Sequence, residues 1–204
     1  MALKTFVKIN QINNLTDARY CAGMTVNLLG FCINPENPHY VSPEEFEEIT
    51  GWLSGVEFVG EISGISVEEI RNQLAKYSGL TWVEHNRLEE LIPLSDLGLS
   101  LIYKCHLDEI NHLDLELEEK LGSNTLYLHL SEIDAVKEKE EEIRVLAEKF
   151  PVILADGFHA DDVVEVIEDL PIYGISLNGG TEIKTGLRDF DQMADILEAL
   201  EIEE

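Results

Sequence analysis

Cations are scarce in this sequence of 204 residues, which has 14 Lys and Arg against 41 Asp and Glu and a formal net charge of −27. Nucleic acids and acidic membrane surfaces are bound by neutralising phosphates, so this balance argues against both as partners. Cysteine is scarce as well: Cys21, Cys32 and Cys105 are odd in number and show no CxxC spacing. This pattern argues against a disulfide framework or a zinc site and favours buried, reduced thiols.

Long apolar runs are also missing. No run approaches the roughly 18 apolar residues of a membrane span, and residues 1–7 lack the apolar core of a signal peptide, so we expect a cytoplasmic protein. Hydrophobic residues still make up 45% of the chain, enough to bury a sizeable core. The length suits one domain or at most two small ones, and no linker divides it, so we expect a single domain over residues 1–204.

Short apolar runs alternate with segments of helical periodicity from one end of the chain to the other. The runs cover residues 6–9, 28–33, 56–62, 80–83, 99–103, 126–130, 152–155 and 172–177. This alternation predicts parallel strands joined by right-handed crossovers, and eight such strands can close into a barrel. A doubly wound open sheet is the alternative, but the sequence has no G-x-G-x-x-G after the first run and no P-loop. The predicted fold class is therefore α/β, a (β/α)₈ or TIM barrel.

Two helix starts are clearly encoded. Ser42 precedes Pro43 and has Glu45 three residues on, and Ser66 is followed in the same way by Glu69, so both segments have the pattern of a capping box. The connectors after Ile9, Leu91 and Lys104 have weaker patterns, and there we expect short or irregular helices.

Polar residues gather where the apolar runs end, and in a barrel these carboxyl ends form the functional face. In chain order they are Asn10, Gln11, Asn34, Glu61, Glu84, His85, Asn86, Lys104, His106, His129, Ser131, Asp156, Gly157, Asn178, Gly179 and Gly180. Strand ends are also polar simply because they meet water. The concentration of His, Glu and Asp nevertheless favours a site.

Two glycine-bearing turns follow the last two runs, at Asp156-Gly157 and at Asn178-Gly179-Gly180. Such turns can direct backbone N–H groups at an anion, and barrels commonly hold a phosphate there, although a tight turn is their ordinary explanation. A carboxylate of Asp156 about 4 Å from a phosphate would cost about 4 kcal/mol per pair of unit charges at an effective dielectric constant of 20. We therefore expect weak phosphate binding at best.

Several segments in order along nearly the whole chain match those of a known family. They are Val7-Lys8-Ile9, Asn14, Asp17-Ala18-Arg19-Tyr20, Leu29-Gly30-Phe31, Asn37-Pro38-His39-Tyr40-Val41-Ser42-Pro43, Leu154-Ala155-Asp156-Gly157 and Asn178-Gly179-Gly180-Thr181-Glu182. With these segments the sequence resembles the phosphoribosylanthranilate isomerase family of tryptophan biosynthesis. It implies a (β/α)₈ barrel and an Amadori rearrangement, in which a general acid opens the ribosylamine ring and a general base removes the proton at C2.

The chain departs from the family where that chemistry takes place. Asn10 stands at the position of the family's general-base Cys, and an amide cannot accept that proton. His129 stands near the position of the general-acid Asp, with Ser131 as the alternative alignment. His39 replaces the Arg that helps to hold the anthranilate carboxylate, and Asp156 replaces a glycine.

We therefore expect a divergent member of this family with a small-molecule pocket at the carboxyl-end face and doubtful isomerase activity. The ligand could be a sugar phosphate, and we expect no cofactor and no resident metal. The predicted catalytic positions are Asn10, His129, Glu61 and Asp156, and the predicted ligand-binding residues are His39, Lys104, Gly157, Asn178, Gly179 and Gly180.

Two alternatives remain open. In the first, an active isomerase of phosphoribosylanthranilate or a related sugar phosphate uses an acid–base or metal-binding set drawn from Glu61, His85, His106, His129 and Asp156. Strand parity limits this set, because adjacent residues such as Glu84 and His85 cannot both face inward. In the second, the chain is a noncatalytic interaction protein with an acidic surface, which a pocket filled by its own side chains would favour. We expect a monomer or a homodimer.

Overall fold

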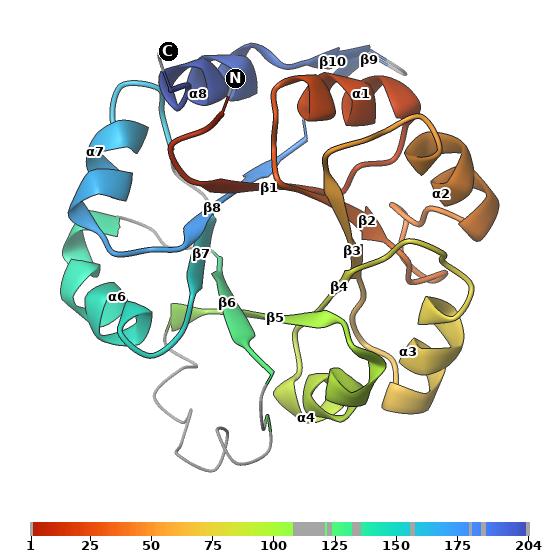
Figure 1. Ribbon diagram of the computed structural model, residues 1–204. Coiled ribbons are helices and arrows are strands. Elements are labelled where there is room, and N and C mark those ends of the chain that lie inside the picture. Colours follow the sequence, from red (N-terminus) through yellow and green to blue (C-terminus); the bar gives the residue numbers. More distant parts are fainter. Residues whose placement is uncertain are drawn as a thin grey trace.

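Eight parallel strands form a closed barrel surrounded by helices (Figure 1). The computed structural model describes residues 2–107, 121, 124–131, 136–155, 158–179, 181–184 and 187–202. The barrel strands are β1 (Phe6–Asn10), β2 (Leu28–Cys32), β3 (Glu57–Glu61), β4 (Trp82–His85), β5 (Ser100–Cys105), β6 (Leu126–Leu130), β7 (Val152–Ala155) and β8 (Gly174–Asn178). All eight overlap the predicted runs, with ends that differ by up to two residues. Strand β1 closes on β8 in register from Phe6↔Gly174 to Asn10↔Asn178. The predicted (β/α)₈ barrel is confirmed.

Helices pack around the outside of the barrel (Figure 1). They are α1 (Leu15–Gly23), α2 (Pro43–Thr50), α3 (Val67–Leu74), α4 (Leu88–Leu91), α6 (Glu140–Ala147), α7 (Val163–Asp169) and α8 (Asp191–Ala199), with 3₁₀ segments η1 (Ile92–Leu97) and η3 (Val136–Glu138). None of the helices in the described part of the chain has the length and apolar character that crossing a bilayer requires.

The helix starts agree with the sequence patterns in most places. Ser42 and Ser66 form the two predicted capping boxes at α2 and α3. The expected irregularity after Leu91 is confirmed, because the four-residue helix α4 ends there and the chain continues as the 3₁₀ segment η1. The expectation of a short or irregular helix after β1 was wrong: α1 is a regular helix of nine residues, and the side chain of Asn14 caps it by accepting the N–H of Asp17. The connector after Lys104 lies mostly outside the described residues.

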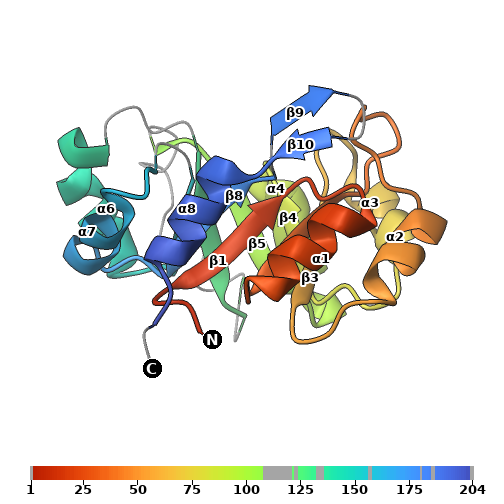
Figure 2. The same cartoon turned by 90° about the horizontal axis from the view of Figure 1, so that it is seen from above.

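A short antiparallel hairpin, which the sequence did not predict, follows the last barrel strand. It pairs β9 (Thr181–Lys184) with β10 (Leu187–Asp189). Figure 2 shows this hairpin at one end of the barrel, with the chain termini at the other end. The hairpin thus lies at the end where the barrel strands finish.

The interior of the barrel changes from apolar to charged along its axis. At the amino ends of the strands, a core cluster contains Leu28, Val59, Trp82, Ile102 and Ile153, with Phe6 and Tyr127 packed against it. At the carboxyl ends, the buried inward residues are polar. They are Lys8, Asn10, Glu84, His129 and Ser176. A larger apolar cluster fills the layer between the barrel and its helices.

Four aromatic rings make a closed cycle at the amino ends of the strands. The ring centroids of Phe6 and Trp82 are 5.9 Å apart, those of Trp82 and Tyr127 4.7 Å, those of Tyr127 and Tyr173 5.0 Å, and those of Tyr173 and Phe6 4.8 Å. These separations fall within the range of favourable aromatic pairs. The cycle closes this end of the barrel with apolar surface.

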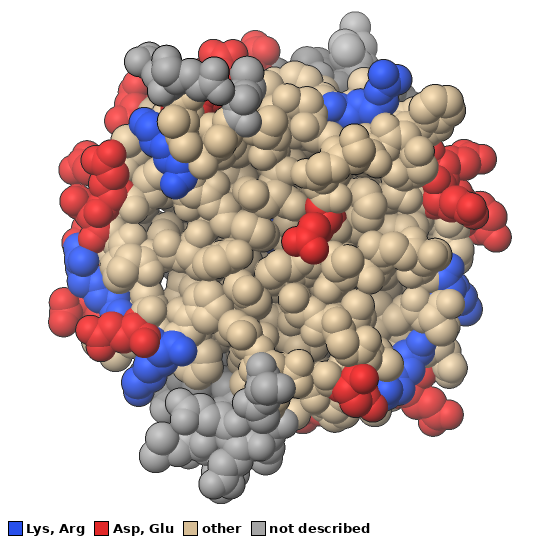
Figure 3. Space-filling view, in the orientation of Figure 1, with Lys and Arg blue, Asp and Glu red and all other residues tan. Residues whose placement is uncertain are grey.

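On the face of the molecule seen in Figure 3, charged side chains lie mainly around the rim. In the orientation of Figure 1, the space-filling view shows acidic side chains over the peripheral helices, with fewer basic ones among them, and a mostly uncharged centre (Figure 3). Cys21, Cys32 and Cys105 are buried as reduced thiols, as predicted. On this face, the charge therefore lies mostly away from the barrel axis.

Candidate functional site

A fully buried lysine lies inside the carboxyl-end half of the barrel. The Nζ atom of Lys8 is 2.7 Å from Oε1 of Glu61 and 3.0 Å from Oε2 of Glu84, and it also donates to Oδ1 of Asn10. An ammonium group has three donors, and these three acceptors satisfy all of them. Burial alone would lower the pKa of Lys8, but the two carboxylates outweigh burial and raise it. Lys8 is therefore a fixed cation beneath the mouth of the barrel.

The carboxylate of Glu61 occupies space that a glycine leaves open. A Cβ atom added at Gly30 would lie 2.0 Å from Oε1 of Glu61, so only glycine at this position permits the observed conformation. The other carboxylate oxygen accepts the backbone N–H of Gln11 at 3.2 Å. Gln11 has a φ of 55°, a left-handed conformation that is uncommon for a residue other than glycine. The turn after β1 thus directs a backbone donor at Glu61.

Glu84 links Lys8 to a buried histidine. Its Oε2 atom is 2.8 Å from Nδ1 of His129, whose side chain is fully buried. Burial would raise the pKa of Glu84, but Lys8 and then His129 outweigh burial and hold it far below its usual range. Glu84 is consequently a permanent carboxylate, and Nδ1 of His129 is the donor to it. Within the described part of the chain, Nε2 of His129 is buried without a hydrogen-bond partner.

Asn10 is held by hydrogen bonds on both sides of its amide. Its Oδ1 atom accepts from Lys8 and from the hydroxyl of Ser176 at 3.0 Å, and its Nδ2 atom donates to Oδ1 of Asn178 at 3.2 Å. The residue is 7% exposed. The side chain of Asn10 therefore ties β1 to β8.

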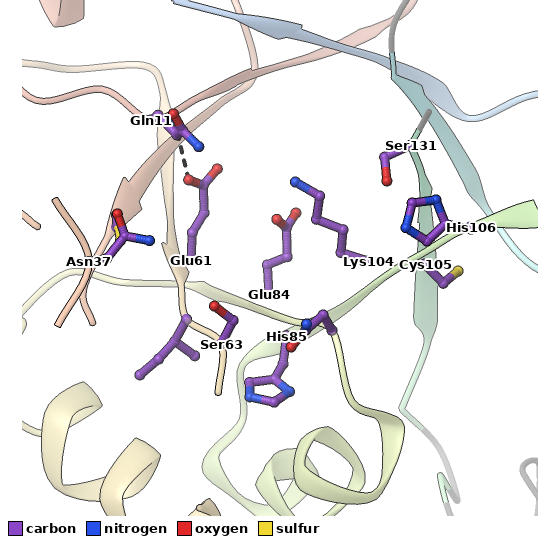
Figure 4. A pocket seen from close by; sticks show the side chains of 13 residues that line it. Gln11, Asn37, Glu61, Ser63, Glu84, His85, Lys104, Cys105, His106 and Ser131 are labelled. Carbon is purple, nitrogen blue, oxygen red and sulfur yellow. Dashed lines mark hydrogen bonds between the residues drawn. The ribbon is translucent and has the colours of Figure 1, made fainter. Parts of the chain in front are cut away.

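A pocket of about 290 Å³ opens above this network (Figure 4). Its lining residues are Gln11, Cys32, Asn37, Glu61, Ile62, Ser63, Glu84, His85, Asn86, Lys104, Cys105, His106 and Ser131. Lys104, Glu61 and Glu84 direct their charged groups into the same space (Figure 4). Apart from Gln11, which follows β1, the lining comes from β2 to β6 and the loops after them.

The structure brings the predicted site residues together in part. Glu61 and Lys104 line the pocket, whereas Asn10 and His129 lie buried beside or below it. Asn178 is exposed at the end of β8, and Gly179 follows it, with its N–H 3.4 Å from the carbonyl oxygen of Asn10. Asp156, Gly157 and Gly180, the remaining predicted positions, lie outside the described residues.

His39 lies on the loop after β2 and is exposed. His39 does not line the pocket. Its backbone N–H donates to Oδ1 of Asn37, and Asn37 is a lining residue. The structure therefore places the neighbouring amide at the pocket, while the imidazole of His39 lies farther out.

The histidines do not converge on one point. His85 turns away from the pocket (Figure 4), and its Nδ1 atom accepts the N–H of Arg87 at 2.9 Å, while Glu84 on the same strand faces inward. This confirms the limit set by strand parity. Among the residues whose positions are described, no group of three or more His, Cys, Asp or Glu side chains is arranged to hold a metal ion. The metal-binding form of the alternative thus gains no support from Glu61, His85, His106 and His129.

Sequence reasoning missed several site residues, and Lys8 is the most important of them. It was noted only as part of the family resemblance, although its position two residues before Asn10 on the same strand already places both side chains on one face. Asn37, Ser63, Cys32 and Cys105 were also missed as lining residues. Asn37 and Ser63 lie in loops, where periodicity gives no signal.

Comparison with known proteins gives a consistent result, although no family model matches the chain. The chain is 27% identical over 208 residues to the N-(5'-phosphoribosyl)anthranilate isomerase of Gloeothece citriformis, covering 95% of this chain and 93% of that protein. It is 25% identical over 219 residues to the enzyme of the same name from Aquifex aeolicus, covering 94% of this chain and 96% of that protein.

Solved structures agree with this result. The phosphoribosyl anthranilate isomerase of Thermotoga maritima superposes with a TM-score of 0.76 at 19% identity, over 96% of this chain and 98% of that one. A second such isomerase, in complex with reduced 1-(o-carboxyphenylamino)-1-deoxyribulose 5-phosphate, superposes with a TM-score of 0.71 at 19% identity and the same coverage. The chain is thus similar along nearly its whole length to proteins of the phosphoribosylanthranilate isomerase family, and it shares their fold.

Proposed function

We propose that this chain is a small-molecule-binding member of its family that does not carry out the family's Amadori rearrangement. The observation that carries the proposal is the state of Asn10. The amide at the general-base position has no basic electron pair, and both of its ends are already hydrogen-bonded to Lys8, Ser176 and Asn178. No movement of this side chain supplies the missing base.

The acid position points in the same direction. His129 is fully buried, and its Nδ1 atom is committed to Glu84. A general acid must come within hydrogen-bond reach of the atom that it protonates, and a side chain without exposed surface does not meet that condition. Ser131, the alternative alignment, lines the pocket but carries a hydroxyl in place of a carboxylic acid.

The position of the pocket supports binding of a ligand. The pocket adjoins β2 to β6, and neither Asn10 nor His129 lines it. A volume of about 290 Å³ lies near the lower end of the roughly 300–1,000 Å³ of ligand pockets, which favours a small ligand. Because the pocket is open and not filled by side chains, it favours a binding role over the purely interacting protein considered above.

An isomerase assay tests the proposal directly. The purified chain should convert no measurable phosphoribosylanthranilate. Conversion is measured as the loss of the substrate's fluorescence. The variant carrying Asn10→Cys and His129→Asp should gain only slight activity, and Asn10→Ala, which removes the amide without adding a base, should gain none. Turnover by the unmodified chain near the ~10 s⁻¹ of a typical enzyme would refute the proposal.

The assembly of the chain is a separate question. One solved relative, from Thermotoga maritima, is described as dimeric. For this chain we propose that it is a monomer or a homodimer. We also propose that it is located in the cytoplasm. Light scattering coupled to size-exclusion chromatography distinguishes the two states.

A further inference from the structure

Charge is divided unevenly across the pocket. On one side, Lys8 offsets only one of the two carboxylates that it contacts, so Lys8, Glu61 and Glu84 together carry a formal charge of +1 − 2 = −1. Part of this negative charge faces the pocket, because Glu61 and Glu84 are both lining residues. The group is a fixed anionic surface, since Glu84 keeps its charge.

The other side of the pocket carries a cation. Lys104 projects from β5 with its ammonium group in the pocket (Figure 4). Its charge acts on Glu84 through space, but no described carboxylate lies close enough to form an ion pair with it. Lys8 is used entirely inside the protein, whereas Lys104 can meet a ligand.

We propose that this pocket binds a small zwitterion that carries an ammonium group and a carboxylate, the chemistry of a free amino acid. The ligand's ammonium would meet Glu61 and Glu84, and its carboxylate would meet Lys104. The inference rests on the proposed function, because it names the ligand class of the same pocket.

Charge balance selects this class over its neighbours. The anionic group and Lys104 sum to zero, so a ligand with one positive and one negative group leaves the pocket neutral, with each charge facing its opposite. A simple carboxylate would leave the anionic group without an opposite charge and would be repelled by it. A simple amine would leave Lys104 without an opposite charge and would be repelled by Lys104. An unmatched charge in a partly buried site is costly, which makes both poorer ligands.

Neutral polar groups complete the site. The Oδ1 atom of Asn37 accepts the N–H of His39, and the amide nitrogen is turned toward the pocket, where it can donate to a carboxylate (Figure 4). The hydroxyls of Ser63 and Ser131 lie on the same lining. The small volume leaves room for a compact ligand rather than for a nucleotide or a peptide.

Calorimetric titration of the full chain with matched ligands tests the inference. Each standard amino acid is titrated first. The tightest binder is then compared with the amine that lacks its carboxylate and with the 2-hydroxy acid that lacks its ammonium group, and ribose 5-phosphate serves as a ligand of the other class. We expect the amino acid to bind at least tenfold more tightly than either truncated analogue and than ribose 5-phosphate.

Variants assign the two charges. Lys104→Met should weaken amino-acid binding at least tenfold and should strengthen binding of the amine, whose charge Lys104 repels. Lys104→Arg should restore part of the loss in amino-acid binding, and Lys139→Met, remote from the pocket, should change nothing. Glu61→Gln should weaken the amine and the amino acid together. If that variant does not fold, Lys104→Met still decides the matter.

The outcomes separate this inference from the proposed function. Absence of amino-acid binding, or equal binding of the 2-hydroxy acid, overturns the inference. Lys104-dependent binding of ribose 5-phosphate in place of amino acids also overturns it, yet leaves a small-molecule site without isomerase activity. Robust isomerase turnover overturns the proposed function, whatever the titrations show.

Discussion

Replacing Lys8 by methionine should destabilise the protein strongly, because two carboxylates would lose their shared counter-ion. Lys8 is fully buried, with Glu61 and Glu84 at 2.7 and 3.0 Å. Removing one partner of a buried ion pair typically costs about 3–5 kcal/mol. We expect the lower part of this range, about 3 kcal/mol, because the side chain of Glu61 is 12% exposed and can turn toward water. For a chain of this size, the melting temperature should fall by roughly 6–12 °C.

Urea unfolding monitored by circular dichroism at pH 7 measures the loss of unfolding free energy. An unchanged m-value shows that the two proteins expose the same surface on unfolding, so that their free energies can be compared. Lys8→Met should lose less stability near pH 5, where its uncompensated carboxylates can take up protons. Adding Glu84→Gln to Lys8→Met should recover part of the loss. The surface variant Lys139→Met should stay within about 1 kcal/mol of the parent. If Lys8→Met costs less than the surface variant, the buried network does not stabilise the barrel as argued.

Two further predictions concern the same network. In Gly30→Ala the new Cβ would lie 2.0 Å from Oε1 of Glu61, and displacing that carboxylate should lower the free energy of unfolding by roughly 1–3 kcal/mol. The matched control is Gly23→Ala, where no atom lies within 4 Å of the new Cβ. In thermal unfolding this control should be neutral or stabilising. Equal effects of the two variants would contradict the steric argument. Because the pKa of Glu84 is lowered from 4.5 in the folded state, its contribution to stability is complete above the unfolded value and is lost as the pH falls below it. The urea midpoint should therefore stay level down to about pH 5 and drop progressively below it, and Glu84→Gln should flatten that drop; an unaltered slope in this variant would exclude Glu84 as its source.

The sequence predicted the barrel well because its strands are defined locally. Each strand is a short apolar run, and Ser42 and Ser66 encode helix starts within four residues. The regular helix α1 was missed because its N-cap, Asn14 bonded to the N–H of Asp17, belongs to a segment with weak apolar periodicity.

The candidate site was predicted less completely, since it depends on contacts across the barrel. Glu61 and Lys104 were identified as site residues because each ends or nearly ends a strand. The pairing of Lys8 with Glu61 joins residues 53 positions apart and needs the register of three strands and the opening at Gly30. Neither periodicity nor composition contains that information.

The four-ring cycle of Phe6, Trp82, Tyr127 and Tyr173 has a consequence for how such a protein can diverge. Because apolar rings close the barrel at the amino ends of its strands, the side chains at the opposite end need not fill the interior to keep the fold. That end can then change side chains that face a ligand without losing closure. Tolerance to change is thus concentrated at the pocket-lining positions outside the buried network of Lys8, Glu84 and His129, and a library of substitutions at those positions should yield many folded variants.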